Sequence, residues 1–374
     1  MSIIQIKEIF TRNELKAFVK FPMELYKGNP YYVPPLIEDE LDTLDKNVNP
    51  VFNHAEARFF LAYKNNKIVG RIATIINKKE IEVGEIKQRF GWLDMIDDIE
   101  VTKMLLETAE KVAKENQLTR VEGPVGFSNM EKAGLLVDGF DKIATMITLY
   151  NFPYYSKHFE QLGYEKSTDW VEYEMNTPKV LGEKVLKFVD LTKKRYNLEV
   201  IDFTSKNELI SYADEMFELL DKTYGKLSSY IPISQLQIEY YKKKYLKFID
   251  PDFVTCIKDT ETNKLMAFSI CMPAYSKALQ KANGKLFPFG WYHLWKATKK
   301  NDSAAFYLIG IDPKLQGKGA IAIIFLEAFK LFINKNISRL ETNPELEDNI
   351  SVQLLWKDYD ATQHKRRRSY FKLV

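Results

Sequence analysis

Apolar and polar positions form two similar patterns along the chain, one in each half. The first covers 57–76, where two apolar runs flank Asn65 and Asn66, and the second covers 252–272. Two apolar runs joined by a short polar turn are typical of a β-hairpin. The sequence therefore predicts one hairpin in each half.

A long amphipathic helix is predicted after each hairpin, because apolar residues recur at three- and four-residue spacing. Each helix is followed by a short strand, a second helix and a last strand. These helix, strand, helix and strand segments cover 99–116, 118–124, 154–166 and 169–175 in the first half and 319–336, 337–343, 349–360 and 366–374 in the second. The repeated order predicts an α/β fold with a mixed α+β sheet, mostly antiparallel, in each half.

A break near Pro178 separates the halves, since the residue before a proline is disfavoured in a helix. Apolar positions then predict a helix up to Tyr196, and a strand is expected over 198–203. We therefore predict a first domain over 1–178, a connecting helix over 179–197 and a second domain over 198–374.

Composition agrees with two globular domains, because the 374 residues are 45% apolar and 28% charged. Counting Lys and Arg against Asp and Glu, residues 1–180 carry 23 and 28, a net charge of −5, and residues 181–374 carry 31 and 23, a net charge of +8. A polyanionic ligand is therefore favoured on the second half. Ordinary surface solvation explains the same asymmetry equally well.

No segment approaches the roughly 20 apolar residues of a membrane-spanning helix, and the first residues do not resemble a secretory signal. We therefore expect a cytoplasmic protein with no integral membrane segment. Cys256 and Cys271 are too few for a disulfide framework, and the four histidines are scattered without metal-ligand spacing. We expect reduced thiols and no metal site.

Two basic runs are interpreted as structural rather than as binding sites. The run at 364–368, HKRRR, precedes the last strand, where edge charges discourage pairing between molecules. We therefore expect no nucleic acid partner. The run at 240–248 is interpreted as a solvated basic face, and the alternative is an amphipathic helix on an anionic membrane.

The segment 306–329 carries the clearest chemistry. An apolar strand runs into a turn containing Gly317 and Gly319, and the turn opens directly into a helix. Unpaired amides at a helix start bind anions, and glycines let the backbone approach them closely. Lys314 and Lys318 add positive charge. The pattern predicts a phosphate cradle, and a plain helix-entry turn is the alternative.

This segment resembles the acetyl-CoA motif of the GNAT acyl-CoA N-acyltransferase superfamily. Gln316 and Gly319 match that motif, whereas Ile321 stands where Gly or Ala is usual. Asn349, Val352, Leu355 and Trp356 follow the spacing of the family's closing helix, with Trp356 in place of a tyrosine. The resemblance implies that acetyl-CoA or another acyl-CoA is held by Ile309, Gly310, Ile311, Gln316, Gly317, Lys318, Gly319, Ala320 and Asn349.

The hairpin end at 69–73 and the segment 158–164 give the first half a resemblance to a GNAT domain as well. Through the runs at 123–141, 150–155 and 286–294, the whole chain resembles uncharacterised bacterial two-domain GNAT-like proteins. The first half lacks the phosphate-binding glycine turn: Asp94, Asp97 and Asp98 stand near the start of its long helix instead. Carboxylates stabilise a helix start and repel a diphosphate. We therefore expect only the second domain to bind CoA, with the first as a degenerate partner that shapes the acceptor site.

The superfamily mechanism implies direct attack of an amine on the thioester, with a carboxylate or a water relay as base. Glu341, on the strand after the CoA helix, is the candidate base; a solvent-facing strand carboxylate is the alternative. Tyr359, one helical turn further, is the candidate acid in place of the missing tyrosine, and a packing role is the alternative. The candidate acceptor pocket contains Glu131, Asp138, Tyr150 and Tyr154, beside Tyr155, and core packing is the alternative for the tyrosines.

The predicted function is therefore transfer of an acyl group from acyl-CoA to a small-molecule or peptide amine, and a lipid amine also stays open. The main alternative is a non-catalytic CoA-binding or scaffold protein, which Ile321 and Trp356 favour. A weaker one is a tandem-GNAT aminoacyl transferase that modifies peptidoglycan precursors.

Overall fold

The computed structural model describes residues 3–128, 130–225, 230–245, 249–349, 353, 356 and 359–374. The strands of the first half are β1 (Ile4–Glu8), β2 (Ala55–Lys64), β3 (Lys67–Asn77), β4 (Lys87–Met95), β5 (Arg120–Gly123), β6 (Leu135–Asp138) and β7 (Glu165–Asn176). Its α-helices are α1 (Arg12–Leu25), α2 (Ile37–Leu44), α3 (Lys78–Glu82), α4 (Ile99–Glu115) and α5 (Tyr154–Gln161).

The second half begins with α6 (Glu183–Arg195), the predicted connecting helix. The later strands are β8 (Leu198–Val200), β9 (Val254–Asp259), β10 (Leu265–Pro273), β11 (Ser303–Ile311), β12 (Arg339–Thr342), β13 (Glu345–Leu346) and β14 (Thr362–Leu373). The other α-helices are α7 (Lys206–Ser211), α8 (Ala213–Tyr224), α9 (Gln235–Tyr245), α10 (Ser276–Ala282), α11 (Gly290–Lys299) and α12 (Ala320–Asn334).

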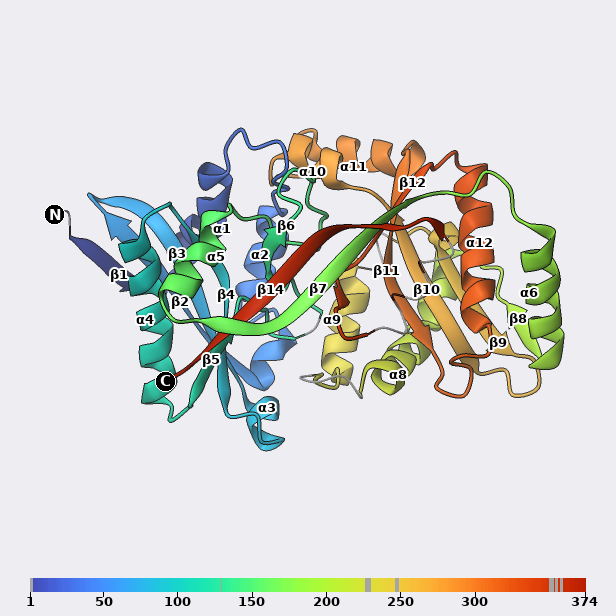
Figure 1. Cartoon of the computed structure of the whole chain (residues 1–374), viewed down its shortest axis with the longest axis horizontal. Coiled ribbons are helices and arrows are strands. Elements are labelled where there is room, and N and C mark those ends of the chain that lie inside the picture. Colours follow the sequence, from blue (N-terminus) through green and yellow to red (C-terminus); the bar gives the residue numbers. More distant parts are fainter. Residues whose placement is uncertain are drawn as a thin grey trace.

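The described strands form one continuous sheet that runs through both halves. Its order is β1-β2-β3-β4-β5-β14-β7-β12-β11-β10-β9-β8, with β6 paired to β14 and β13 paired to β7. The two halves exchange their last strands, because β14 pairs with β5 of the first half and β7 pairs with β12 of the second. Figure 1 shows β14 and β7 crossing side by side through the middle of the molecule.

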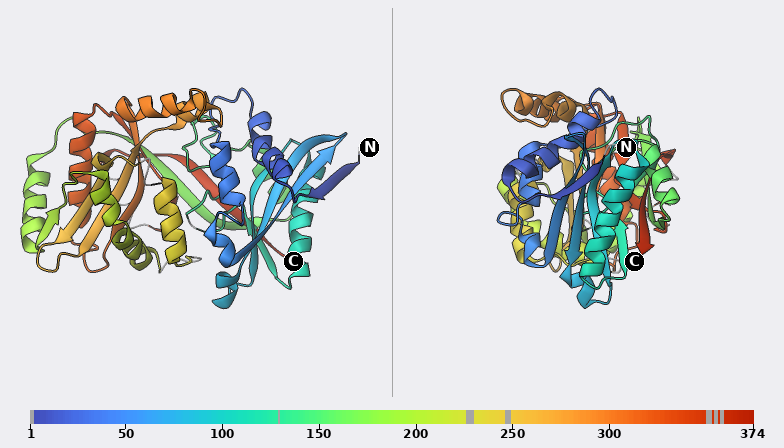
Figure 2. Two further views of the ribbon diagram at one scale, coloured as in Figure 1. Left: turned by 180° about the vertical axis from the view of Figure 1, so that it is seen from behind. Right: turned by 90° about the vertical axis from the view of Figure 1, so that its left-hand side faces the viewer.

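Helices cover both faces of this sheet (Figure 2). In the second half, α12 fills one core together with α6 and the adjoining strands, and α8 and α10 pack on the other face. In the first half α4 and α5 cover one face, and α1 and α2 cover the other. The core around α8 also takes in Tyr26, Leu136 and Tyr150 from the first half. The halves therefore share apolar packing as well as the sheet.

The predicted α/β class is confirmed, and both hairpins and both long helices form close to their predicted bounds. The strand expected over 198–203 ends at Val200. The prediction of a separate sheet in each half is wrong, because β7 and β14 join the halves into one sheet. Among the described residues, no helix has the length and apolar character needed to cross a bilayer.

The interpretation of 364–368 as edge charges is wrong. These residues lie inside β14, which is paired on both sides, and His364, Lys365 and Arg367 are buried. Side chains two residues apart share one face of a strand, and on this face Lys365 and Arg367 both pair with the buried Glu172. The described part of the run at 240–248 lies in α9, where Tyr241 is buried and Lys244 bonds Thr43 of the first half; 246–248 lie outside the described residues.

Candidate active site

The parallel strands β11 and β12 separate partway along their length. Their pairing ends with Phe306 opposite Thr342, and from there β11 continues beside β10. The chain after β12 turns at Asn343, whose side-chain amide donates to the Tyr307 carbonyl, and as β13 it pairs with β7. Among the described strands, none pairs with the last residues of β11 on this side. The sheet therefore has an interior strand edge at this point.

Backbone groups on this edge of β11 face helix α8. The Thr223 hydroxyl donates to the Ile311 carbonyl at 3.3 Å, and the Tyr224 hydroxyl donates to the Ile309 carbonyl at 3.2 Å. In an antiparallel pair the N–H and C=O of one residue point to the same side. The amides of Ile309 and Ile311 therefore also point away from β10, and the edge offers donors to a bound extended ligand.

The turn after β11 leads directly into α12. Gly317 and Gly319 have φ angles of 71° and 86°, in the left-handed region that favours glycine. Gly319 is the N-cap of α12, and among the described residues no side chain caps this helix start. Its first amides therefore lack the usual side-chain acceptor, at the positive end of the helix dipole. Gln316 and Lys318 lie exposed beside it.

Glu345 lies at the start of β13, just past the separation of the strands. The Trp356 indole N–H donates to both carboxylate oxygens, at 2.8 and 3.0 Å. Burial raises the pKa of Glu345 to about 7, although the Trp356 hydrogen bond lowers it. Burial, with the neighbouring Glu345 carboxylate, also raises the pKa of Tyr224 to about 12. Tyr224 is close enough to Glu345 to respond to its charge, and the Tyr224 hydroxyl also donates to the Ile309 carbonyl of β11. Glu345 therefore lies close to the open edge of β11.

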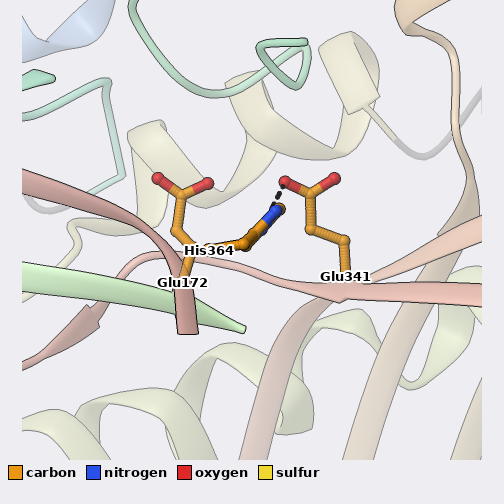
Figure 3. A group of neighbouring side chains, drawn as sticks. All are labelled: Glu172, Glu341 and His364. Carbon is orange, nitrogen blue, oxygen red and sulfur yellow. Dashed lines mark ion pairs between the residues drawn. The ribbon is translucent and has the colours of Figure 1, made fainter. Parts of the chain in front are cut away.

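Glu341 has a different environment, inside the ionic cluster of β7, β12 and β14. Its carboxylate pairs with Lys365. It also pairs with His364 Nε2 at 3.2 Å, as Figure 3 shows. Burial raises the pKa of Glu341, but the His364 hydrogen bond and the Lys365 charge outweigh burial and lower it. Glu172 pairs with Arg367 Nε at 2.5 Å and with Lys365 Nζ at 3.3 Å.

One group in the described part of the chain has metal-ligand character. Single ligand atoms of Glu172, Glu341 and His364 lie within 4.8 Å of one another. Lys365 and Arg367 already neutralise the two carboxylates, and positive charges this close oppose a divalent cation by Coulomb repulsion. We therefore treat this group as an ionic cluster.

No protein-family model matches the chain. Two curated relatives are similar over nearly their whole length. Protein YghO of Escherichia coli K12 is 28% identical over 377 residues, which cover 99% of this chain and 95% of YghO. The bacterial ceramide synthase of Caulobacter vibrioides is 26% identical over 394 residues, which cover 100% of this chain and 98% of that enzyme.

A solved structure decides the fold. The tandem GNAT protein from the clavulanic acid biosynthesis pathway aligns with a TM-score of 0.58 and 10% identity, covering 99% of this chain and 98% of that one. The chain has a tandem GNAT fold. The resemblance that the glycine turn suggested is confirmed at the level of the fold.

The acyl-CoA residues predicted for the second GNAT unit lie mainly along the open edge of β11 and the turn before α12. Gly310 is buried, and a Cβ atom added at this position would lie 2.5 Å from the Phe268 ring. Ala320 is the first residue of α12. Asn349 lies after β13, and its backbone N–H donates a hydrogen bond to the Leu346 carbonyl at 3.0 Å. Val352 and Leu355 of the closing motif lie outside the described residues. The acyl-CoA role of all these residues stays a prediction.

Tyr359 and Trp356 of the closing segment both contact the apolar side of α12. The Tyr359 ring packs 5.5 Å from Phe325 and 5.1 Å from Phe329, centroid to centroid. Trp356 packs 5.2 Å from Phe325. Tyr359 is therefore part of the packing between this segment and α12, and its predicted role as an acid stays untested.

In the first GNAT unit, Asp98 caps α4 by accepting from the Glu100 amide at 3.1 Å, as a carboxylate at a helix start should. Asp94 lies in β4 instead, paired with Arg71 at 2.7 Å. The end of β4 is occupied by the chain's own tyrosines. The Met95 amide donates to the Tyr155 hydroxyl at 3.0 Å, and the Tyr154 hydroxyl donates to the Met95 carbonyl at 2.6 Å.

The four predicted acceptor residues do not gather at the open edge of β11. Tyr150 and Tyr154 belong to an aromatic cluster with Phe152 near the end of β4. Glu131 accepts from the Ser128 amide at 2.7 Å, and Asp138 is exposed at the end of β6. Within the described residues, none of the four hydrogen bonds to Glu345. Their role in acceptor binding stays a prediction.

Sequence reasoning missed Glu345. One signal was present: Glu345 follows Asn343-Pro344 at the carboxyl end of a predicted strand, where ligands bind in many α/β sheets. Its raised pKa was not predictable, because it depends on burial by residues distant in sequence.

Proposed function

We propose that the second GNAT unit transfers an acyl group from acyl-CoA to an amine. The observation that carries this proposal is the separation of β11 from β12 directly before the glycine turn of α12. An unpaired strand edge suits the amide-containing arm of CoA, and uncapped helix amides suit its diphosphate. The edge and the turn adjoin, so one extended anionic ligand fits both.

Each residue then has a defined task. The amides of Ile309 and Ile311 bind the extended arm, and Lys314 and Lys318 add positive charge near the diphosphate. Acyl-CoA supplies its acyl group as a thioester. Glu345 takes the proton that the amine loses as its nitrogen replaces sulfur on the acyl carbon. The departing thiolate takes a proton from solvent, Glu345 returns its proton to solvent, and the products are an amide and the free CoA thiol.

Glu345 suits the role of base better than Glu341 does. A general base works best when its pKa lies near the working pH, and the pKa of Glu345 is raised to about 7. Glu341 is held as the anion by Lys365 and His364, which weakens its attraction for a further proton.

We propose further that the acceptor is an amine with a long alkyl chain. This rests on the full-length similarity to a relative named as a bacterial ceramide synthase, because a ceramide is the amide of a long-chain amino alcohol. A panel of amines of increasing chain length, with release of CoA thiol as the readout, tests this point. Turnover that rises with chain length supports it, and preference for short amines contradicts it.

Replacing Gly319 with glutamate is expected to abolish stabilisation by acyl-CoA. The new carboxylate opposes the diphosphate, and its Cβ atom lies 2.8 Å from the Phe188 ring. A ligand at about 100 times its dissociation constant stabilises the wild type by about 2.7 kcal/mol, measured by thermal unfolding. Acetyl-CoA and long-chain acyl-CoAs are both tried.

Two further variants test whether the added charge at the turn, rather than strain in it, causes this loss. Lys318→Glu changes the charge without straining the turn and should weaken the shift. Lys103→Glu adds the same charge to exposed Lys103 on α4, the corresponding helix of the first unit, and should leave the shift intact. A full shift in Gly319→Glu, or no shift in the wild type with any acyl-CoA, refutes CoA binding at this turn.

The alternative is a CoA-binding protein without turnover. Trp356 favours it, because an indole in place of the family's usual tyrosine supplies no acidic hydroxyl for the departing thiolate. An acyl-CoA shift without thiol release on any amine supports this alternative.

A further inference from the structure

Helices α10 and α11 form an insertion between β10 and β11 that is fixed to the first half. The Gln280 side-chain amide donates to the Pro30 carbonyl at 2.8 Å, and the Ile37 amide donates to the Gly284 carbonyl at 2.9 Å. The Ser276 hydroxyl donates to the Ala144 carbonyl at 2.8 Å. Figure 2 shows this insertion on the outside of the molecule. Whatever it exposes is therefore held in a defined position.

The outer side of this insertion carries large aromatic residues that are not covered by the rest of the chain. We call them the aromatic patch: Phe287 (77% exposed), Phe289 (69%), Trp291 (50%), Tyr292 (42%) and Trp295 (53%). Single exposed apolar residues are ordinary, but a group within nine residues marks an interaction surface. Trp and Tyr are also enriched where a protein meets the boundary between water and lipid.

Exposed lysines lie before and after the aromatic patch along the chain. Residues 274–301 contain six lysines and no aspartate or glutamate. All six are exposed, and none forms an ion pair with another described residue: Lys277, Lys281, Lys285, Lys296, Lys299 and Lys300. Lysines beside exposed aromatic side chains are the pattern of a surface that binds anionic lipid.

We propose that the aromatic patch docks on the surface of an anionic lipid bilayer. The aromatic side chains enter the boundary between headgroups and acyl chains, and the lysines contact anionic headgroups. A second copy of the chain fits this surface less well, because symmetric pairing would bring two sets of six lysines together without acidic partners. The contact is peripheral and independent of the proposed acyl transfer.

The first test is flotation of the full chain with vesicles. Vesicles of phosphatidylglycerol and phosphatidylcholine in equal parts should bind the wild type about tenfold or more tightly than phosphatidylcholine alone, and added salt should weaken this binding. Phe289→Ser/Trp291→Ser/Trp295→Ser should lose about tenfold or more of the binding. Lys296→Glu/Lys299→Glu/Lys300→Glu should lose the preference for phosphatidylglycerol.

The matched control is Val185→Ser/Leu186→Ser/Leu191→Ser on α6, which removes three other exposed apolar side chains and should bind as the wild type does. Thermal unfolding checks that every variant folds. Equal binding to both vesicle types, or equal loss in the control, overturns the proposal. If the wild type binds no vesicles but sediments as a dimer, and the aromatic variant disrupts that dimer, the aromatic patch binds a second copy of the chain and the proposal is overturned. The acyl-CoA thermal shift is measured separately, so failure of either proposal is distinguishable.

Discussion

Replacing Glu345 with glutamine is expected to lower turnover by about 10²–10⁴-fold, the usual contribution of a positioned base. Glutamine keeps an acceptor for the Trp356 indole but takes up no proton. The acyl-CoA thermal shift should be unchanged, because Glu345 acts on the amine. Release of CoA thiol at saturating acyl-CoA is the measurement, and retention of wild-type turnover excludes Glu345 as the base.

The pH dependence of turnover provides a second test of Glu345 as the base. With the pKa of Glu345 raised to about 7, wild-type turnover should rise with pH up to about that value and then level off. Trp356→Phe removes the hydrogen bond that lowers this pKa, so the rise should move to higher pH. An unchanged pH profile in this variant would show that the group whose titration controls turnover is not Glu345.

The same substitution should stabilise the protein at high pH. A carboxyl whose pKa is higher in the folded state binds its proton more tightly there, so its contribution to stability falls as pH rises from its ordinary value to about 7 and is constant above. Glu345→Gln removes this loss. We expect the variant to exceed the wild type by about 1–3 kcal/mol at about pH 8 and to match it at about pH 4. Chemical denaturation at both pH values measures this.

Replacing Glu172 with glutamine is expected to destabilise the chain by about 3–5 kcal/mol. Glu172, Lys365 and Arg367 are buried, and Glu172 pairs with both cations. Its neutralisation leaves Arg367 without its carboxylate partner and Lys365 with Glu341 alone. Because β7 and β14 belong to the sheet of both halves, the halves should lose stability together. Denaturant unfolding followed by two spectroscopic probes measures both effects.

Glu347→Gln is the matched control. Glu347 pairs with Lys166 at 2.9 Å and with Arg366, but its side chain is 40% exposed, so its loss should cost less than about 1 kcal/mol. Glu172→Leu/Lys365→Met/Arg367→Met removes the Glu172 charge together with both of its cations and should recover part of the loss. Equal effects of Glu172→Gln and Glu347→Gln would show that burial adds nothing to the Glu172 pairs.

Local sequence signals predicted much of the geometry of the glycine turn and of the long helix in each unit. The apolar spacing of 319–336 predicted α12, and Gly317 and Gly319 adopt the left-handed conformation that their turn requires. Asp98 caps α4, as a carboxylate before an amphipathic helix should. These features depend on residues within one or two turns of each other, so sequence alone contains their cause.

The site's chemistry depended on distant residues. The charge of Glu341 is set by His364 and Lys365 of β14, whereas the pKa of Glu345 is raised by burial and lowered in part by the Trp356 hydrogen bond. Sequence analysis identified Glu341 as a strand carboxylate but had no means to find these partners. A pKa reflects the surrounding dielectric and charges, which no spacing pattern records.

By itself, the sequence of this protein determined its two hairpins, the long helix after each, their repeated order and the glycine turn, because these follow from side-chain periodicity and local backbone preference. Only the tertiary structure decided which strands are neighbours. It paired β14 with β7 on one side and with β6 and β5 on the other, so the basic run at 364–368 lies inside the sheet rather than at its edge. Strand pairing over long separations depends on the whole core, and the local pattern of a central strand and that of an edge strand are too similar to distinguish them.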